Sequence, residues 1–235
     1  MEDKEHIDTD TRNKLALALD VDDLVVGVRV ARELQPYFGV IKIGLELYSA
    51  AGPEILGTLQ QLGYKIFLDL KLHDIPNTVN SAAKVLGSLG VDYLTLHTAG
   101  GTEMATAGVE GLLEGARNAG LADPIALGVT ILTSDQDSSD TLMEERLKVA
   151  VASGCRGLVC SAEDLPYVRN HAPALLRVVP GIRPLGVEAH DQKKTATPLE
   201  AIKSGADLLV IGRAVTQADD PVMASIQIHT ELTRD

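Results

Sequence analysis

Short apolar runs alternate with amphipathic stretches along most of this chain. The runs are mostly continuous, rich in Leu, Ile and Val, and bounded by Gly, Asp or Pro. Such runs are typical of strands that are buried on both faces, as in a parallel sheet. We predict strands at Leu15–Leu19, Val40–Ile43, Ile66–Leu70, Tyr93–Leu96, Ile125–Val129, Gly157–Cys160, Leu176–Val179 and Leu208–Ile211.

The stretches between these strands carry apolar residues at helical spacing. Several of them end at a glycine, such as Gly63, Gly90 and Gly120, which is the residue most often found just beyond a helix. We predict helices over Leu24–Leu34, Pro53–Leu62, Asn77–Leu89, Thr102–Ala119, Asp140–Ala152, Ala162–Asn170 and Pro198–Ser204.

This rhythm of strand and helix predicts a closed α/β barrel. The chain has 235 residues, so eight units take about 29 residues each, close to the length of a βαβ repeat. We therefore expect a single (β/α)8 TIM-barrel domain over residues 1–235, with residues 1–12 as a loosely ordered tail. An open doubly wound sheet is the alternative, but the segment Asp20–Asp23 is not the glycine-rich turn that such sheets carry after their first strand.

Composition narrows the classes of partner. The net charge of −12, the 3% of aromatic residues and the lack of Trp disfavour nucleic-acid binding. No apolar run approaches the length of a membrane span, and the polar first residues do not look like a secretory signal. Cys155 and Cys160 lack the spacing of a zinc site, so we expect buried thiols in a reducing cytoplasm.

Polar residues gather where the predicted strands end, and the active sites of TIM barrels lie at the C-terminal ends of the strands. These residues are Asp20, Lys42, Asp69, Lys71, His73, Asp74, His97, Thr130, Thr133, Ser134, Arg183, Gly212 and Arg213. The six histidines and the carboxylates do not show the spacing of a metal-binding motif, and we expect no metal.

The segment from Asp69 to Lys71 is the most informative. The two residues are two apart on a strand, so their side chains should share one face, within reach of Lys42 on the neighbouring strand. Carboxylates around Lys71 would keep it protonated, as a proton donor and anion stabiliser and not as a Schiff-base nucleophile. The alternative is an ion-pair network that holds the layers of the barrel together.

Two further segments have the character of phosphate-binding elements. The backbone N–H of Gly212 and the guanidinium of Arg213 suit a phosphate after the eighth strand, with Arg183 close by. The polar segment 186–197 is predicted to be a lid that offers Gln192 to the phosphate, or else an ordinary solvated loop.

Taken in order, several motifs resemble those of the orotidine 5′-phosphate decarboxylases, in particular the shorter bacterial type. The resemblance runs from about Leu15 to Pro221 and departs mildly at 189–194, where the family often has a second acid before Asp191. The motifs are Asp20, Lys42-x-Gly44, Asp69-x-Lys71-x-x-Asp74-Ile75-Pro76, Leu132-Thr133-Ser134, Pro180-Gly181-Ile182-Arg183-Pro184 and Ile211-Gly212-Arg213.

The resemblance implies a cytoplasmic lyase of UMP biosynthesis that converts orotidine 5′-phosphate to UMP and CO₂ without metal or organic cofactor. It implies a homodimer with composite sites, in which Asp74, Ile75 and Thr78 reach into the partner's site. Lys71 would stabilise and protonate C6, with Asp69, Asp74 and Lys42 as the other catalytic residues. The implied substrate-binding residues are Asp20, Lys42, Asp69, Ile75, Thr78, Thr133, Arg183, Gln192, Gly212 and Arg213.

Two alternatives remain open at this point. One is a metal-dependent phosphosugar decarboxylase or an epimerase on the same barrel. The decarboxylase of 3-keto-gulonate 6-phosphate shares the Asp-x-Lys-x-x-Asp motif but has a carboxylate where Lys42 stands, so Lys42 favours the orotidine enzyme. The other alternative is a protein that binds a phosphate-containing ligand but catalyses no reaction.

Overall fold

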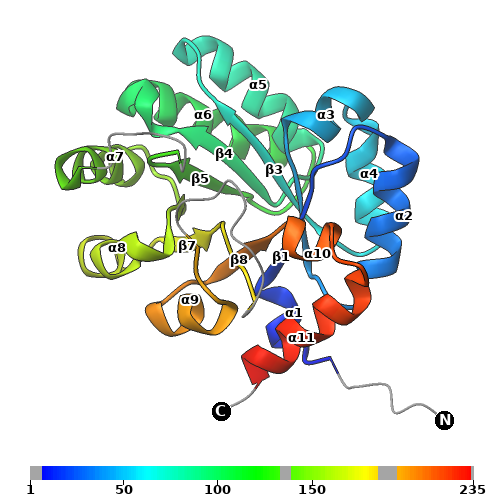
Figure 1. The fold of residues 1–235 in the computed structure, drawn as a ribbon. Helices are drawn as coiled ribbons and strands as arrows, with labels where there is room; N and C mark the ends of the chain where they lie inside the picture. The colour runs from blue at the N-terminus through cyan, green and yellow to red at the C-terminus, as the bar shows by residue number, and fades with distance from the viewer. Residues whose placement is uncertain (1–6, 133–138, 185–194, 234–235) are drawn as a thin grey trace.

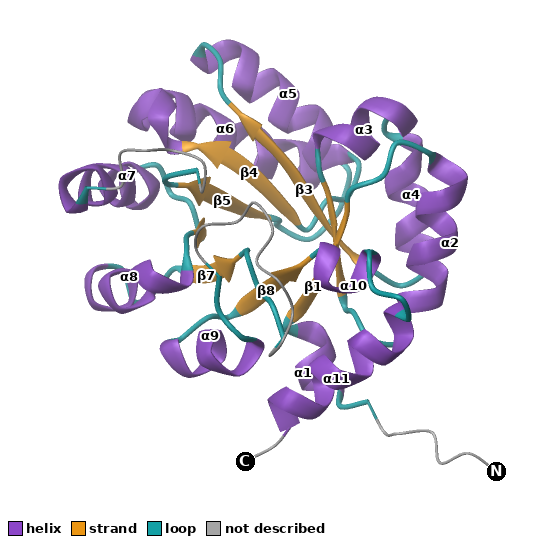
Figure 2. Cartoon of the chain, in the orientation of Figure 1, coloured by secondary structure: helices purple, strands orange, loops and turns teal. Residues whose placement is uncertain are grey.

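The computed structural model describes residues 7–132, 139–184 and 195–233. Eight parallel strands close into a barrel in which each strand pairs with the next in sequence and the last pairs with the first (Figures 1 and 2). The predicted TIM barrel is therefore confirmed. The strands are β1 (Leu15–Leu19), β2 (Val40–Ile43), β3 (Lys65–Leu72), β4 (Tyr93–His97), β5 (Ile125–Val129), β6 (Gly157–Val159), β7 (Leu176–Val179) and β8 (Leu208–Ile211).

Helices surround the barrel on its outside (Figure 2). Two short 3-10 helices, η1 (Thr98–Gly100) and η2 (Ala162–Asp164), precede α6 and α8. The α-helices are α1 (Thr9–Asn13), α2 (Leu24–Leu34), α3 (Leu45–Ala51), α4 (Glu54–Gln61), α5 (Pro76–Ser88), α6 (Gly101–Asn118), α7 (Asp140–Ala152), α8 (Leu165–His171), α9 (Pro198–Ser204), α10 (Arg213–Thr216) and α11 (Pro221–Thr233).

The ends of the elements follow local chemistry. The Asp23 carboxylate accepts the N–H of Val26 and caps α2, and Thr197 and Glu200 form a reciprocal capping box at the start of α9. β1, β2, β5, β7 and β8 have the predicted bounds. β3 and β4 extend further than predicted, to Leu72 and His97, whereas β6 ends one residue earlier.

Part of the predicted N-terminal tail forms a helix. The carboxylate of Asp8 accepts the N–H of Thr11 at 2.8 Å and caps α1, and Thr11 is buried. Residues Thr9–Asn13 thus form a helix, α1, that packs against the last helix, α11 (Figure 1). Helices α3 and α11 are likewise additions to the predicted set.

The core has two layers, one inside the barrel and one between the strands and the helices. Strands β1 and β8 are both buried along their whole length, as the continuous apolar runs predict. The inner layer consists of Ala16, Ala18, Val40, Phe67, Tyr93, Leu127, Val178, Leu208 and Val210. This apolar plug closes the barrel below the C-terminal ends of the strands and forms the floor on which a site can stand.

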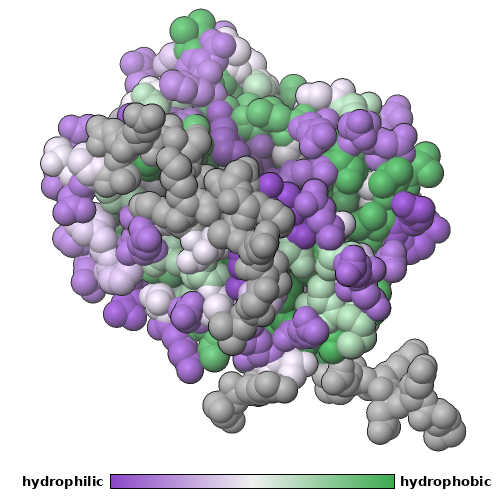
Figure 3. Space-filling view, in the orientation of Figure 1, coloured by the Kyte–Doolittle hydropathy of each residue, from purple (hydrophilic) through white to green (hydrophobic). Residues whose placement is uncertain are grey.

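Apolar side chains are also exposed outside the core. Ile75 is 65% exposed before α5, and Val85 is 60% exposed on that helix. Figure 3 shows apolar side chains at the surface over the N-terminal end of α5 and hydrophilic ones near the centre of the same face. The centre is where the C-terminal ends of the strands open.

Candidate active site

The charged residues of the site continue the inward-facing positions of the strands. Successive side chains of a strand alternate between its two faces, so a residue two positions after an inner-layer residue faces inward as well. Asp20 follows Ala18, Lys42 follows Val40, and Asp69 follows Phe67. The alternation that builds the apolar floor therefore also places three charges directly above it.

Lys71 reaches the same site by a different route. Leu68 pairs with Leu94 and Leu72 pairs with Leu96, so the step of four residues on β3 faces a step of two on β4. Lys71 lies in this bulge with φ of 50°, the only positive φ at a non-glycine residue in the described part of the chain. The prediction that Asp69 and Lys71 share a face is confirmed, but an irregular strand produces it.

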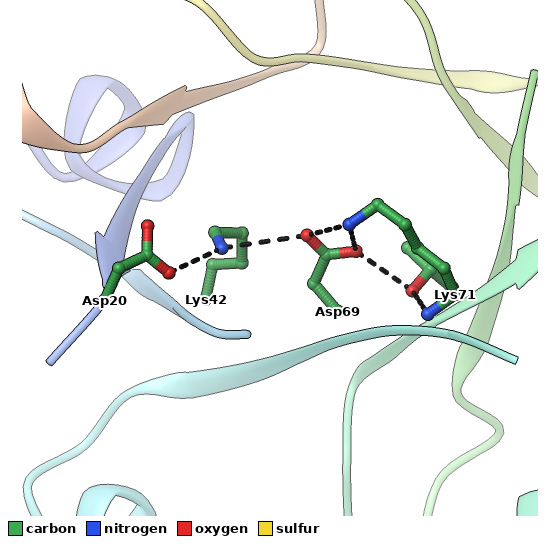
Figure 4. Close-up of polar contacts among 5 residues, drawn as sticks. Asp20, Lys42, Asp69 and Lys71 are labelled. Atoms are coloured by element: carbon green, nitrogen blue, oxygen red, sulfur yellow. Dashed lines mark hydrogen bonds and ion pairs between the residues drawn. The ribbon is translucent and has the colours of Figure 1, made fainter. Parts of the chain in front are cut away.

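The four charges form a continuous chain of contacts (Figure 4). The ammonium of Lys71 donates to both carboxylate oxygens of Asp69 at 2.9 Å. The Nζ of Lys42 lies 3.6 Å from Oδ2 of Asp69 and 3.2 Å from Oδ1 of Asp20. Carboxylates and ammonium groups thus alternate across β1, β2 and β3, as the sequence predicts.

Asp69 is the electrostatic centre of this array. Burial acts to raise the pKa of Asp69, but the positive charges of Lys42 and Lys71 and the hydrogen bonds from Lys71 and Thr95 outweigh it, and the pKa lies below its usual value. Asp69 is therefore a carboxylate at neutral pH. Its carboxylate lies 2.9 Å from the ammonium of Lys71 and 3.6 Å from that of Lys42, and an ammonium in this place can donate a proton or stabilise an anion.

The array borders a cavity of about 640 Å³ at the C-terminal ends of the strands. Arg183, Gly212 and Arg213 lie on the side of β7 and β8, so the predicted phosphate-binding cations open onto the same cavity as the array. The described lining is Ala18, Asp20, Lys42, Glu46, Phe67, Asp69, Lys71, Val129, Ile131, Leu132, Val159, Pro180, Gly181, Arg183, Val210, Gly212, Arg213, Thr216 and Gln217.

Three predicted site residues that the structure describes are not part of this lining. Asp74, Ile75 and Thr78 are exposed at the start of α5, and the carboxylate of Asp74 accepts the N–H of Ile75 at 2.7 Å. Thr133 and Gln192 lie outside the described residues, as does most of the segment that was predicted to be a lid.

Thr95 is a site residue that was not predicted from the sequence. Thr95 is fully buried on β4, and its hydroxyl contacts both Asp69 and the backbone of Lys71. Its position two residues after Tyr93, which belongs to the inner layer, is the sequence feature that points to it. Glu46, Thr216 and Gln217 also line the cavity and were not predicted.

Two histidines flank the site without entering the array. Nδ1 of His97 accepts the N–H of Ala99 at 3.2 Å, and its ring stacks on that of His73 with centroids 5.4 Å apart. In the described residues, no three His, Cys, Asp or Glu side chains are grouped as metal ligands. No helix in that part of the chain is long and apolar enough to cross a membrane.

A closed parallel barrel with an alternating charge array at its C-terminal ends defines the class of TIM barrels that carry an active site at this face. Residues 13–228 match the model of one such family. The chain belongs to the orotidine 5′-phosphate decarboxylase / HUMPS family.

Individual relatives agree with this assignment. The chain is 45% identical over 203 positions to the orotidine 5′-phosphate decarboxylase of Lactiplantibacillus plantarum, which covers 81% of this chain and 86% of the relative. It is 39% identical over 241 positions to the orotidine 5′-phosphate decarboxylase of Moorella thermoacetica, and the match covers 97% of this chain and 96% of that relative. The crystal structure of orotidine 5′-phosphate decarboxylase from Lactobacillus acidophilus superposes with a TM-score of 0.78 at 34% identity, covering 94% of this chain and all of that one.

Proposed function

We propose that this protein decarboxylates orotidine 5′-phosphate to UMP and CO₂, the reaction that supplies UMP in pyrimidine biosynthesis. The relatives carry that name, and the match extends over nearly the whole chain. The observation that carries the proposal is the ammonium of Lys71, which both oxygens of Asp69 hold at 2.9 Å above an apolar floor.

The chemistry asks for this kind of site. When the bond between C6 and the carboxylate breaks, its electron pair stays on C6 as a carbanion that the pyrimidine ring does not delocalise. Such a charge must be stabilised electrostatically by groups that are already in place. An ammonium beside C6 stabilises the charge and then donates its proton to C6, and the Lys71 amine regains a proton from solvent.

The other residues of the array have supporting roles in this proposal. Asp69 holds Lys71 and stands near the leaving carboxylate. Lys42 holds Asp69, Asp20 holds Lys42, and both of these contact the ribose hydroxyls.

Phosphate binding is assigned to the opposite wall of the cavity. Arg213 and the backbone of Gly212 are proposed to bind the phosphate, together with Arg183 and Gln192. Thr133 is proposed to bind the edge of the pyrimidine. Binding energy from the phosphate, far from C6, then contributes to the transition state of the decarboxylation.

We further propose a homodimer with shared sites, in which Asp74, Ile75 and Thr78 enter the partner's cavity. This placement is supported by their exposure at the start of α5, shortly after Lys71 in the chain, and by the 65% exposure of Ile75, an apolar side chain that an interface would bury. The shared site would add the carboxylate of Asp74 to the array on the other side of Lys71.

The proposed reaction uses no metal or organic cofactor. Lys42 supports this, because it places an ammonium 3.6 Å from Asp69, where the metal-dependent phosphosugar relative has a carboxylate. The names of the relatives also favour the orotidine reaction over the phosphosugar alternative. The two free, buried cysteines suit the cytoplasm, where we expect the protein to work.

The test is the loss of ultraviolet absorbance of orotidine 5′-phosphate on addition of the purified protein, with EDTA present and UMP identified as product. The protein is prepared from a host that lacks its own decarboxylase. Turnover that EDTA leaves unchanged supports the proposal. Tight binding of the nucleotide without turnover points to a binding protein, and turnover that EDTA abolishes points to metal-dependent chemistry.

A further inference from the structure

The hydroxyl of Thr95 occupies an unusual position in the array. It accepts the backbone N–H of Lys71 at 2.8 Å, and it donates to Oδ1 of Asp69 at 3.1 Å. The side chain is fully buried. Because one lone pair of the oxygen receives the Lys71 N–H, the single hydroxyl hydrogen is left for the carboxylate.

These contacts close a ring of hydrogen bonds. The ammonium of Lys71 binds Asp69 directly, and the backbone of Lys71 binds it through Thr95. Both ends of one residue are therefore tied to the same carboxylate. A side chain as long as that of Lys loses several freely rotating bonds in such a ring, which fixes where its Nζ stands.

The ring also accounts for the backbone of β3. In a regular strand the N–H of Lys71 would donate to a carbonyl of the next strand, but the bulge between Leu68 and Leu72 interrupts the ladder. The φ of 50° at Lys71 lies in the left-handed region, which is strained for a residue with a Cβ. The hydroxyl of Thr95 takes the place of the missing carbonyl and so holds the strained conformation.

We infer that Thr95 is a positioning residue, which sets the Lys71 ammonium and the Asp69 carboxylate in their reactive arrangement through its single hydroxyl. The inference rests on the proposed function, because the reactive arrangement is defined by decarboxylation at C6. The charged groups that face Asp69 are Lys42 and Lys71, with Asp20 on the far side of Lys42.

The variant Thr95→Val keeps the branched shape and removes the hydroxyl. We expect kcat to fall about 10- to 100-fold, the loss typical of a hydrogen bond to a charged group. KM and the affinity for UMP should stay within about twofold, because the phosphate-binding wall is untouched. Thr95→Ser restores the hydroxyl and should recover kcat to within about threefold of the natural protein.

Thr98→Val is the matched control. Thr98 is also fully buried, three residues further on, but its hydroxyl donates to the carbonyl of Val129 at 2.7 Å. Its replacement should lower the melting temperature by an amount similar to that of Thr95→Val and leave kcat within about twofold. If kcat falls in both variants in proportion to the fall in melting temperature, the inference is contradicted.

The acid limb of the pH profile of kcat provides a second readout. Without the bond from Thr95 the carboxylate of Asp69 is less stabilised, so the limb moves to higher pH in Thr95→Val and returns in Thr95→Ser. The titration of Asp69, followed by ¹³C NMR of labelled aspartate and assigned with Asp69→Asn, should move in the same direction. An unmoved titration overturns the inference.

Two outcomes separate the inference from the function on which it rests. If the natural protein does not decarboxylate orotidine 5′-phosphate, the proposed function fails, whereas the titration of Asp69 still tests the contact with Thr95. If Thr95→Val does not fold, Thr95→Ala and Thr95→Ser give the same comparison without the extra methyl. Equal kcat and equal titration in those two variants refute the positioning role.

Discussion

Removal of the Lys71 ammonium tests the assignment of the proton donor most directly. Lys71→Met keeps a side chain of similar length and keeps the Cβ. The backbone strain at φ of 50° is therefore unchanged, and any change in stability reports the lost ion pair with Asp69. The variant must be prepared in a host without its own decarboxylase, because a trace of host enzyme would mask a large loss.

The size of the effect follows from two contributions. A charge about 4 Å from an ammonium gains roughly 4 kcal/mol at an effective dielectric constant of about 20, which is about 10³-fold in rate. Loss of the general acid contributes a further 10²- to 10⁴-fold, approximately. We expect kcat to fall about 10⁵- to 10⁷-fold in Lys71→Met.

The fold should survive this change. The side chain of Lys71 is 34% exposed, and Asp69 keeps Lys42 at 3.6 Å, so the free energy of unfolding should fall by only about 1–3 kcal/mol. The pKa of Asp69 is lowered in the folded protein, so its contacts stabilise the fold at pH values above the pKa of the unfolded chain. This stability is lost as the pH falls through the pKa of the folded protein. Without Lys71 that loss should begin at a higher pH.

The assay compares single turnover of orotidine 5′-phosphate by the natural protein, Lys71→Met and the control Lys148→Met, with melting curves from neutral pH to pH 4. Lys148 pairs with Glu144 on the surface of α7 and is 72% exposed, so its replacement removes a charge without touching the site. Turnover by folded Lys71→Met within about tenfold of the natural rate refutes the reasoning.

Three further predictions test other parts of the structure. A random mixture of Lys71→Ala and Asp74→Asn chains should regain roughly a quarter of natural activity, since half the dimers hold one intact shared site; no recovery speaks against sharing. Gly44→Ala places a Cβ 3.1 Å from Oδ1 of Asp20. Steady-state kinetics should show kcat/KM lowered about tenfold, while the melting temperature stays unchanged. Burial raises the pKa of Cys160 to about 12, so Ellman's reagent at pH 8 should label it only in denaturant.

The barrel could be predicted because its strands are apolar on both faces. A continuous run such as Leu15–Leu19 reports burial on each side, and β1 has those bounds. Helix α11 escaped prediction because Ser225 and His229 are among its buried residues, and their polarity hides the apolar face. Helix α1 depends on its contact with α11, which local sequence does not reveal.

The charge array was predictable for a related reason. Lys42 stands inside an apolar run, and alternation from Val40 turns it inward. The hydrogen bonds of Thr95 could not be predicted, because they depend on a register shift between two strands and on a left-handed residue that alternation does not anticipate. The place of Asp74 depends on a second chain.

The bulge in β3 limits how the motif can be transferred to another scaffold. Read as a string, Asp69-x-Lys71 is three residues long and fits any barrel strand. As a physical unit it also contains the two extra residues of β3 in the bulge and a hydroxyl on β4. A designer who grafts the three letters onto a regular strand would lose the tether on the lysine backbone, so the portable module is a pair of adjacent strands.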